Sequence, residues 1–261
     1  MEKLHTESYI RDTKSPWLVF LHGFGGSVKM WKRQLTHFKE RYNLLLIDLP
    51  GHGESTEGIH GKHITKFEGI ADIIVDTLGT QGIKHATFMC VSLGSLIFAS
   101  ILSKYPELVD GAILCGAISG MNLFYKSILM GVSKIKFMLP YMTILTAFAY
   151  VLMPYKEHKK SREFFIKSGK LLGRDEFMAW FNLFVKDMNV LKNLENFKKN
   201  ILFVMGNEDF VFLSGIKKKY SQVKNTKLKI LDHCGHVCNI QKWNEFNRVS
   251  SEYIESLENI H

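Results

Sequence analysis

Short, continuous apolar runs recur along the chain, and each is followed by a turn and a segment with helical character. The runs cover residues 17–21, 43–47, 86–91, 111–115, 201–205 and 228–231. Because they do not alternate apolar with polar side chains, they are typical of strands buried on both faces of a sheet. Strands that alternate with helical segments predict an α/β fold, with a mainly parallel central sheet flanked by helices. Residues 8–11 are expected to add an edge strand.

One long segment, residues 120–196, breaks this alternation. It contains no strand-like run bounded by turn residues, and seven of the eleven methionines and eight of the nineteen phenylalanines lie in it. We therefore predict that residues 1–119 and 197–261 form the α/β core. Residues 120–196 are predicted to be a helical cap or lid, inserted over the mouth of the sheet.

The uncharged stretch 137–155 within the cap raises the question of a membrane span. A spanning helix needs about 20 mostly apolar residues. This stretch is marginal in length and is interrupted by Pro140, Thr143 and Thr146. Helices that line an apolar pocket are the preferred interpretation, and contact of the cap with a membrane surface is the intermediate alternative.

The chain of 261 residues carries 34 basic and 25 acidic residues, a net charge of +9. A positive surface favours anionic lipids, acidic substrates or nucleic acid as partners. No zinc-finger pattern or RNA-binding aromatic motif is present, so nucleic acid is not expected. The lysine runs 198–199 and 217–219 are interpreted as solvated faces, with an anionic membrane or an acyl-carrier surface as the alternative.

The cysteines predict a reducing compartment rather than disulfides. Cys90 and Cys115 lie in strand-like runs, where a free thiol behaves as a small hydrophobic residue. The first residues lack the apolar core of a signal peptide, so a cytoplasmic protein is expected. Residues 233–238 contain histidine and cysteine, but they offer only one arm of the paired spacing that zinc sites use, and no metal is expected.

A serine follows the apolar run at residues 86–91. A serine nucleophile stands on a tight turn between strand and helix, and small residues two positions before and after it relieve crowding. Here Cys90 and Gly94 flank Ser92, and a helix-like segment follows until Pro106. This stretch alone is equally compatible with a serine that only begins a helix.

Three other segments offer the groups that such a serine needs. The glycine-rich residues 22–26 follow the first clear strand, and the N–H groups of Phe24 and Leu93 would form a pair of oxyanion donors. Asp209 and His236 each follow a later strand, and the order Ser92, Asp209, His236 is that of a triad on an open α/β sheet. Glu208 and His233 are the rival acid and base.

Together these segments resemble the α/β-hydrolase superfamily over nearly the whole chain except the cap. The similar segments are the oxyanion loop at 22–26, the D-x-P-G-x-G-x-S turn at 48–55, the nucleophile elbow at 90–94, the acid loop at 206–209 and the histidine loop at 235–236. Cys90 departs from the family, which usually has glycine there. The resemblance favours His236 over His233, and His22 and His52 are interpreted as structural.

The resemblance implies a serine hydrolase of the carboxylesterase or lipase-like class, acting through Ser92, His236 and Asp209 without a cofactor. Methionine and phenylalanine in the cap predict an apolar pocket for an acyl chain, as in a monoacylglycerol, another lipid ester or an acylated lactone. Alternatively, these residues only pack the cap against the core. C–C bond hydrolases, thioesterases and lactonases use the same triad, and a small-ligand binding protein is the non-enzymatic alternative.

Overall fold

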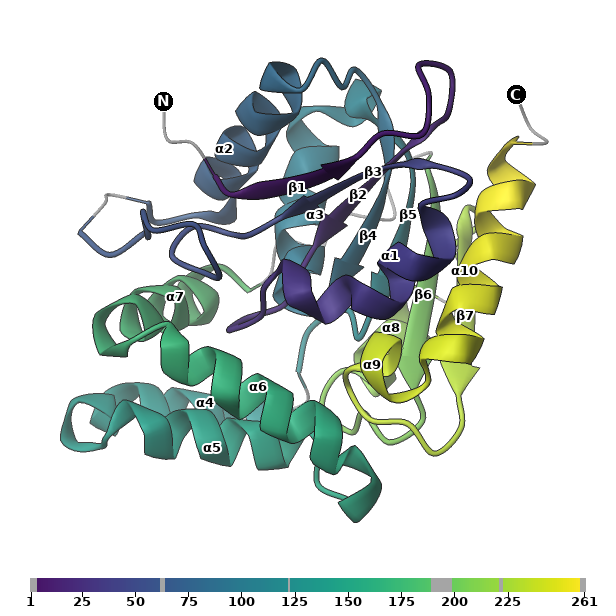
Figure 1. Cartoon of the computed structure of the whole chain (residues 1–261). Coiled ribbons are helices and arrows are strands. Elements are labelled where there is room, and N and C mark those ends of the chain that lie inside the picture. The colour runs from purple at the N-terminus through teal and green to yellow at the C-terminus, as the bar shows by residue number, and fades with distance from the viewer. Residues whose placement is uncertain (1–3, 62–63, 122, 189–198, 221–222, 259–261) are drawn as a thin grey trace.

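A seven-stranded sheet runs through the molecule in the order β1-β3-β2-β4-β5-β6-β7 (Figure 1). The computed structural model describes residues 4–61, 64–121, 123–188, 199–220 and 223–258. Its strands are β1 (Thr6–Tyr9), β2 (Trp17–Leu21), β3 (Asn43–Ile47), β4 (Ala86–Val91), β5 (Val109–Cys115), β6 (Asn200–Gly206) and β7 (Thr226–Leu231). Each neighbouring pair is parallel except β1 with β3. The predicted α/β fold with a mainly parallel sheet is thus confirmed.

The continuous apolar runs form strands because helices cover both faces of the sheet. Every residue of β3 and β4 is buried. The edge strand β1 lies slightly earlier than expected, at Thr6–Tyr9 instead of residues 8–11. Its antiparallel pairing ends where Tyr9 meets Leu44. The amide of Arg11 then bonds to the side chain of Asn43 instead of a strand, which corrects the predicted position.

Helices α2 and α3 cover one face of the sheet, and α1 and α10 cover the other (Figure 1). The core helices are α1 (Lys32–Phe38), α2 (Phe67–Thr80), α3 (Leu93–Lys104), α8 (Leu213–Tyr220), α9 (Cys238–Gln241) and α10 (Trp243–Glu258), with short 3₁₀ helices η1 (Val28–Trp31) and η2 (Pro106–Leu108). The apolar side of α10 buries Phe246, Tyr253 and Leu257. Burial of such a stripe stabilises an amphipathic helix more than its intrinsic propensity does.

The cap helices lie between β5 and β6 in the chain and group at one end of the molecule (Figure 1). They are α4 (Leu123–Ile135), η3 (Lys136–Met138), α5 (Tyr141–Leu152), η4 (Lys156–His158), α6 (Lys159–Leu171) and α7 (Arg174–Asp187). The expected boundary near residue 196 lies outside the described residues. Residues 137–155 do not form one helix, because the chain breaks at Pro140 before α5 begins. Within the described ranges, no helix is both long and apolar enough to cross a bilayer.

Helix α7 attaches the cap to the core through a buried carboxylate. Both oxygens of Glu176 accept backbone N–H bonds, from Ile59 at 2.6 Å and from His60 at 2.8 Å. The side chain leaves no room beside it, since a Cβ on Gly58 would lie 2.1 Å from Oε2 of Glu176. Buried backbone donors need such partners, so this carboxylate fixes the loop that follows β3.

Two more residues on the same helix extend this attachment. Trp180 lies one turn after Glu176 and donates from Nε1 to the carbonyl of Pro50 at 3.2 Å. Asp187, at the end of α7, accepts the N–H of Phe67 at 2.7 Å, where α2 begins. An acceptor at a helix start satisfies a donor that the helix itself leaves open. Cap and core are therefore joined along the whole length of α7.

Two buried histidines join the loops that follow β2 and β3. His22 Nε2 accepts the N–H of Leu49 at 3.0 Å, and His52 Nε2 accepts the N–H of Gly25 at 3.0 Å. Each ring contacts a backbone carbonyl through Nδ1, which requires a neutral ring protonated at Nδ1. Burial lowers the pKa of His22 to about 4 and that of His52 to about 3.

We expect the substitution Glu176→Gln to lower the free energy of unfolding by about 1–3 kcal/mol, because an amide NH₂ group would face a buried backbone donor. Urea denaturation measures the change. Glu163→Gln on α6 is the matched control, because this glutamate is exposed and pairs with the exposed Lys159. Equal stability of Glu176→Gln and the control would contradict the assigned role of Glu176.

Acid should destabilise the fold through His22 and His52. The unfolded chain protonates histidine near pH 6.5, whereas the folded rings resist protonation, so stability is complete above pH 6.5 and is lost as the pH falls toward the folded pKa values. Between pH 7 and pH 5 the loss should be about 2 kcal/mol for each ring.

Urea denaturation at both pH values tests this expectation. The substitution His52→Gln should remove about half of the pH-dependent loss. His60→Gln, whose side chain is exposed, should leave that loss unchanged. A pH dependence that is the same in His52→Gln and the unmodified protein would refute the explanation.

Candidate active site

Ser92 occupies the turn between β4 and α3 in a conformation that few residues other than glycine adopt. Its φ is 51° and its ψ is −113°. Positive φ costs energy for a residue with a Cβ and is kept where the surrounding fold enforces it. Gly94 makes the turn fit, because a Cβ there would lie 2.4 Å from the carbonyl oxygen of Leu21. The turn therefore presses α3 against the end of β2.

Cys90 lies before this turn, inside the sheet. It is fully buried in β4 and pairs in register with Leu21 of β2. Burial raises the pKa of its thiol well above the usual value. A protonated thiol in the core is a small hydrophobic side chain rather than a nucleophile.

The structure brings Ser92, His236 and Asp209 into one chain of hydrogen bonds. His236 Nε2 lies 2.8 Å from Ser92 Oγ, and His236 Nδ1 lies 2.8 Å from Asp209 Oδ2. Asp209 and the histidine are both buried. The carboxylate accepts the proton on Nδ1, which leaves the lone pair of Nε2 for the serine hydroxyl. Residues 144 positions apart in the sequence thus meet at the carboxyl ends of the strands.

Close packing of neighbouring loops fixes the acid and the imidazole. The second oxygen of Asp209 accepts the N–H of Phe212 at 3.2 Å. A Cβ on Gly116, which has a φ of 52°, would lie 2.3 Å from the carbonyl oxygen of His236. Gly116 was not singled out in the sequence, although a glycine directly after the predicted strand at 111–115 was the available signal.

The glycine-rich loop after β2 lies beside the serine. A Cβ on Gly23 would be 3.2 Å from the Cβ of Ser92. Leu93 is the first residue of α3, so its N–H has no carbonyl partner within the helix. Phe24 and Leu93 line the same pocket as Ser92. This placement is compatible with two N–H donors aimed at one oxygen near Ser92 Oγ.

The rival acid and base make other contacts. His233 is 83% exposed and lies 3.8 Å from Glu208. Glu208 instead bonds at 2.7 Å to Nε2 of His158, a fully buried residue of η4 in the cap. Asp232 is exposed. The structure does not bring His233 or Glu208 to the serine.

Sequence reasoning missed His158, which connects the cap to two of the loops at the site. Its Nδ1 accepts the N–H of Tyr155 at 3.3 Å, so Nε2 carries the proton donated to Glu208. A Cβ on Gly235 would lie 3.0 Å from the His158 ring. His158 therefore touches the residue before Asp209 and the residue before His236. A lone histidine in a lysine-rich stretch gave no signal of this role.

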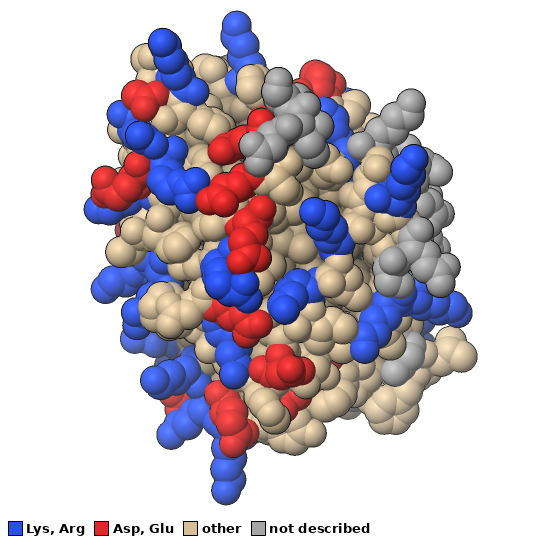
Figure 2. Space-filling model, turned by 90° about the vertical axis from the view of Figure 1, so that its right-hand side faces the viewer, with Lys and Arg blue, Asp and Glu red and all other residues tan. Residues whose placement is uncertain are grey.

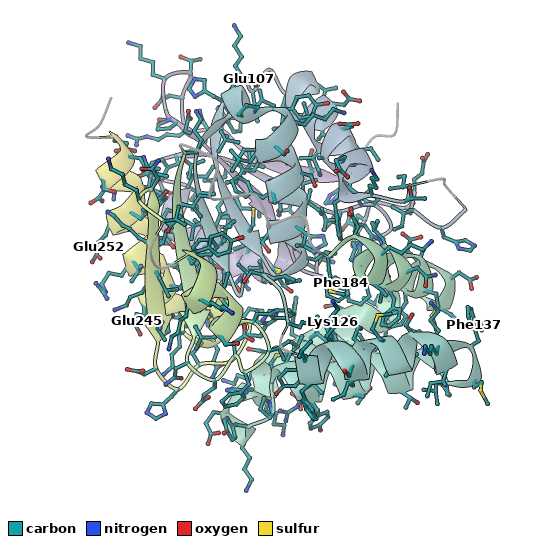
Figure 3. The ribbon with its side chains drawn as sticks, turned by 180° about the vertical axis from the view of Figure 1, so that it is seen from behind. Glu107, Lys126, Phe137, Phe184, Glu245 and Glu252 are labelled. Atoms are coloured by element: carbon teal, nitrogen blue, oxygen red, sulfur yellow. The ribbon has the colours of Figure 1, made fainter. Side chains whose placement is uncertain are left out.

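An apolar pocket opens above Ser92 between core and cap. Its walls include Phe24 from the core and Phe148, Phe165, Phe177, Trp180 and Phe184 from the cap. Phe184 lies between α7 and the neighbouring cap helices in Figure 3. No charged side chain is among the described residues that line it. The same part of the chain contains no group of three histidine, cysteine or acidic side chains arranged to hold a metal ion.

The sequence is similar to a family model and to curated enzymes over part of its length. A family model for the α/β hydrolase fold matches residues 16–141. The 2-succinyl-6-hydroxy-2,4-cyclohexadiene-1-carboxylate synthase of Citrobacter koseri is 36% identical over 83 residues, 32% of this chain and 31% of that protein. The enzyme of the same name from Escherichia coli O17:K52:H18 is 34% identical over 116 residues, 44% of this chain and 42% of that protein. These matches span less than half the length of either relative.

Solved structures resemble the whole chain. A hydrolase from Pseudomonas aeruginosa PA01 superposes with a TM-score of 0.81 at 15% identity, covering 96% of this chain and 94% of its own. An esterase from Exiguobacterium antarcticum superposes with a TM-score of 0.79 at 16% identity, covering 97% of this chain and 95% of the esterase chain. MenH from S. aureus superposes with a TM-score of 0.74 at 18% identity, covering 97% of this chain and 99% of the MenH chain. The family match and these superpositions show that the chain has the α/β-hydrolase fold.

Proposed function

We propose that the protein is a serine hydrolase that cleaves a carboxylic ester with an apolar acyl group, a carboxylesterase or lipase-like activity. The observation that carries the proposal is the hydrogen-bonded series Ser92, His236 and Asp209, whose serine lines an apolar pocket. A serine hydroxyl becomes a nucleophile when a histidine accepts its proton and a carboxylate orients the ring. Both conditions have a matching contact here.

In the proposed mechanism, His236 takes the Ser92 proton while Oγ attacks the ester carbonyl carbon. The N–H groups of Phe24 and Leu93 hold the tetrahedral oxyanion, and Asp209 stabilises the imidazolium ion. Collapse expels the alcohol, which takes the proton from His236. Water then attacks the acyl-enzyme with His236 as the base, releasing the acid and restoring Ser92. These residues complete the reaction with water as the second substrate.

The pocket lining supports an uncharged, apolar acyl group. The product in the relatives' name carries succinyl and carboxylate groups. Lys and Arg side chains are the usual partners of such anions, and the described lining of this pocket has none. A monoacylglycerol, another lipid ester or an acylated lactone, which is a cyclic ester, fits this lining better than a dicarboxylate.

A fluorophosphonate probe tests the nucleophile. It should label the unmodified protein and fail to label Ser92→Ala or His236→Ala, and Asp209→Asn should lower kcat by about 10⁴. Ser100→Ala, which removes the hydroxyl of a buried serine in α3, and His233→Ala are the matched controls and should label normally. If the folded unmodified protein is not labelled, the small-ligand binding alternative replaces hydrolysis.

A chain-length series of p-nitrophenyl esters tests the acyl group. Each methylene buried in the pocket should contribute about 0.8 kcal/mol, or about fourfold in kcat/KM, until the pocket is filled. Octanoate should therefore exceed acetate, and Phe148→Asp should reduce octanoate turnover far more than acetate turnover. Acetate turned over better than octanoate would rule out the apolar acyl substrate while leaving the nucleophile intact.

A further inference from the structure

The solvent-facing side of α4 is apolar, contrary to the usual pattern of a surface helix. Phe124, Ile128 and Ile135 are spaced so that they lie on one side of the helix. The exposed large apolar residues here are Leu123, Phe124, Ile128, Met130 and Ile135 on α4, followed by Phe137 and Met138 in η3; we call this set the α4 apolar surface. The most exposed members are Leu123 and Met138, each 83% accessible.

The opposite side of α4 already performs the packing that the cap requires. Leu129 is buried and lines the pocket above Ser92. A surface helix needs one apolar side, which packs against the rest of the protein. The fold does not explain why the exposed side of α4 is apolar as well. Phe137 lies at the outer end of the cap and projects away from the core in Figure 3. Contiguous exposed apolar side chains of this kind mark an interaction surface.

The charged residues along this stretch of the sequence are of one sign. From residue 111 to residue 156 the sequence contains no Asp or Glu, and its charged residues are Lys126, Lys134, Lys136 and Lys156. Lys126 and Lys134 are exposed on α4 itself. The face seen in Figure 2 differs, because basic and acidic side chains are intermingled there. The α4 apolar surface is thus accompanied by lysines that have no acidic neighbour in this stretch of sequence.

We propose that the α4 apolar surface docks on an anionic lipid bilayer, with α4 parallel to the membrane plane. Apolar side chains would enter the boundary between headgroups and acyl chains, and the lysines would meet anionic headgroups. A second copy of the chain fits less well, since a symmetric contact would bring the lysines of two α4 helices together without acidic partners. Docking is independent of ester hydrolysis, but it would bring the wall of the pocket formed by Leu129 close to the lipids.

Vesicle sedimentation tests the proposal with the full chain. Phosphatidylcholine vesicles containing about one-third phosphatidylserine should bind the protein, and pure phosphatidylcholine vesicles should bind it far less. Binding should fall steeply as salt is raised, because salt screens exposed charges. Absence of binding to either vesicle would overturn the proposal, as would binding that ignores both salt and lipid charge.

Paired variants locate the contact. Phe124→Ser with Phe137→Ser should abolish binding, and Lys126→Gln with Lys134→Gln should weaken it by about fivefold for each lysine. Ile10→Ser, an exposed apolar residue of the core, and Lys84→Gln are the matched controls. Equal binding by the α4 variants and the controls would overturn the location.

Two further measurements separate this proposal from others. Light scattering should show that the variants leave the molar mass unchanged; a dimer that the Phe124 and Phe137 substitutions dissociate would assign the surface to a second copy instead. Labelling of Ser92 by a fluorophosphonate in solution should be equal in the variants and the unmodified protein, which shows that they fold. Lipid binding without labelling would contradict the hydrolase function alone, and labelling without lipid binding would contradict docking alone.

Discussion

The turn at Ser92 is the constraint on which the site depends. A residue with a side chain is held at positive φ, and the absence of a Cβ at Gly94 lets α3 approach the carbonyl of Leu21. Such a conformation persists only where the surroundings enforce it. The enforcement comes from the parallel sheet, because β2 and β4 are neighbours and end together. A fold without that pairing would let the turn relax and withdraw the hydroxyl from His236.

Buried polar side chains also hold the loops around the site in place. Glu176, His22 and His52 all accept backbone N–H groups of loops that have no regular secondary structure. Each contact satisfies a donor that would otherwise be buried without a partner. Because both rings must stay neutral to accept these bonds, the arrangement of the loops is tied to pH as well as to packing.

Much of the architecture could be predicted because it depends on local pattern. Continuous apolar runs marked the buried strands, and serine, acid and histidine each followed such a run. The interactions that escaped prediction are made between distant segments. The ending of β1 depends on the side chain of Asn43, and the contacts of Glu176 and His158 depend on how the cap packs on the core. No periodicity or spacing encodes such a meeting, so only the folded chain reveals it.

His158 gives the cap a part in the geometry of the core. Its ring fills the space over Gly235 and holds the carboxylate of Glu208, so the segments carrying the acid and the imidazole are clamped from outside the sheet. The cap therefore contributes to the structure of the site and does more than cover it. In an evolving lineage, exchange of the cap for one with a different pocket would have to preserve a ring at this point or find a substitute for it. The shape of the pocket and the alignment of Ser92, His236 and Asp209 are therefore coupled in this architecture.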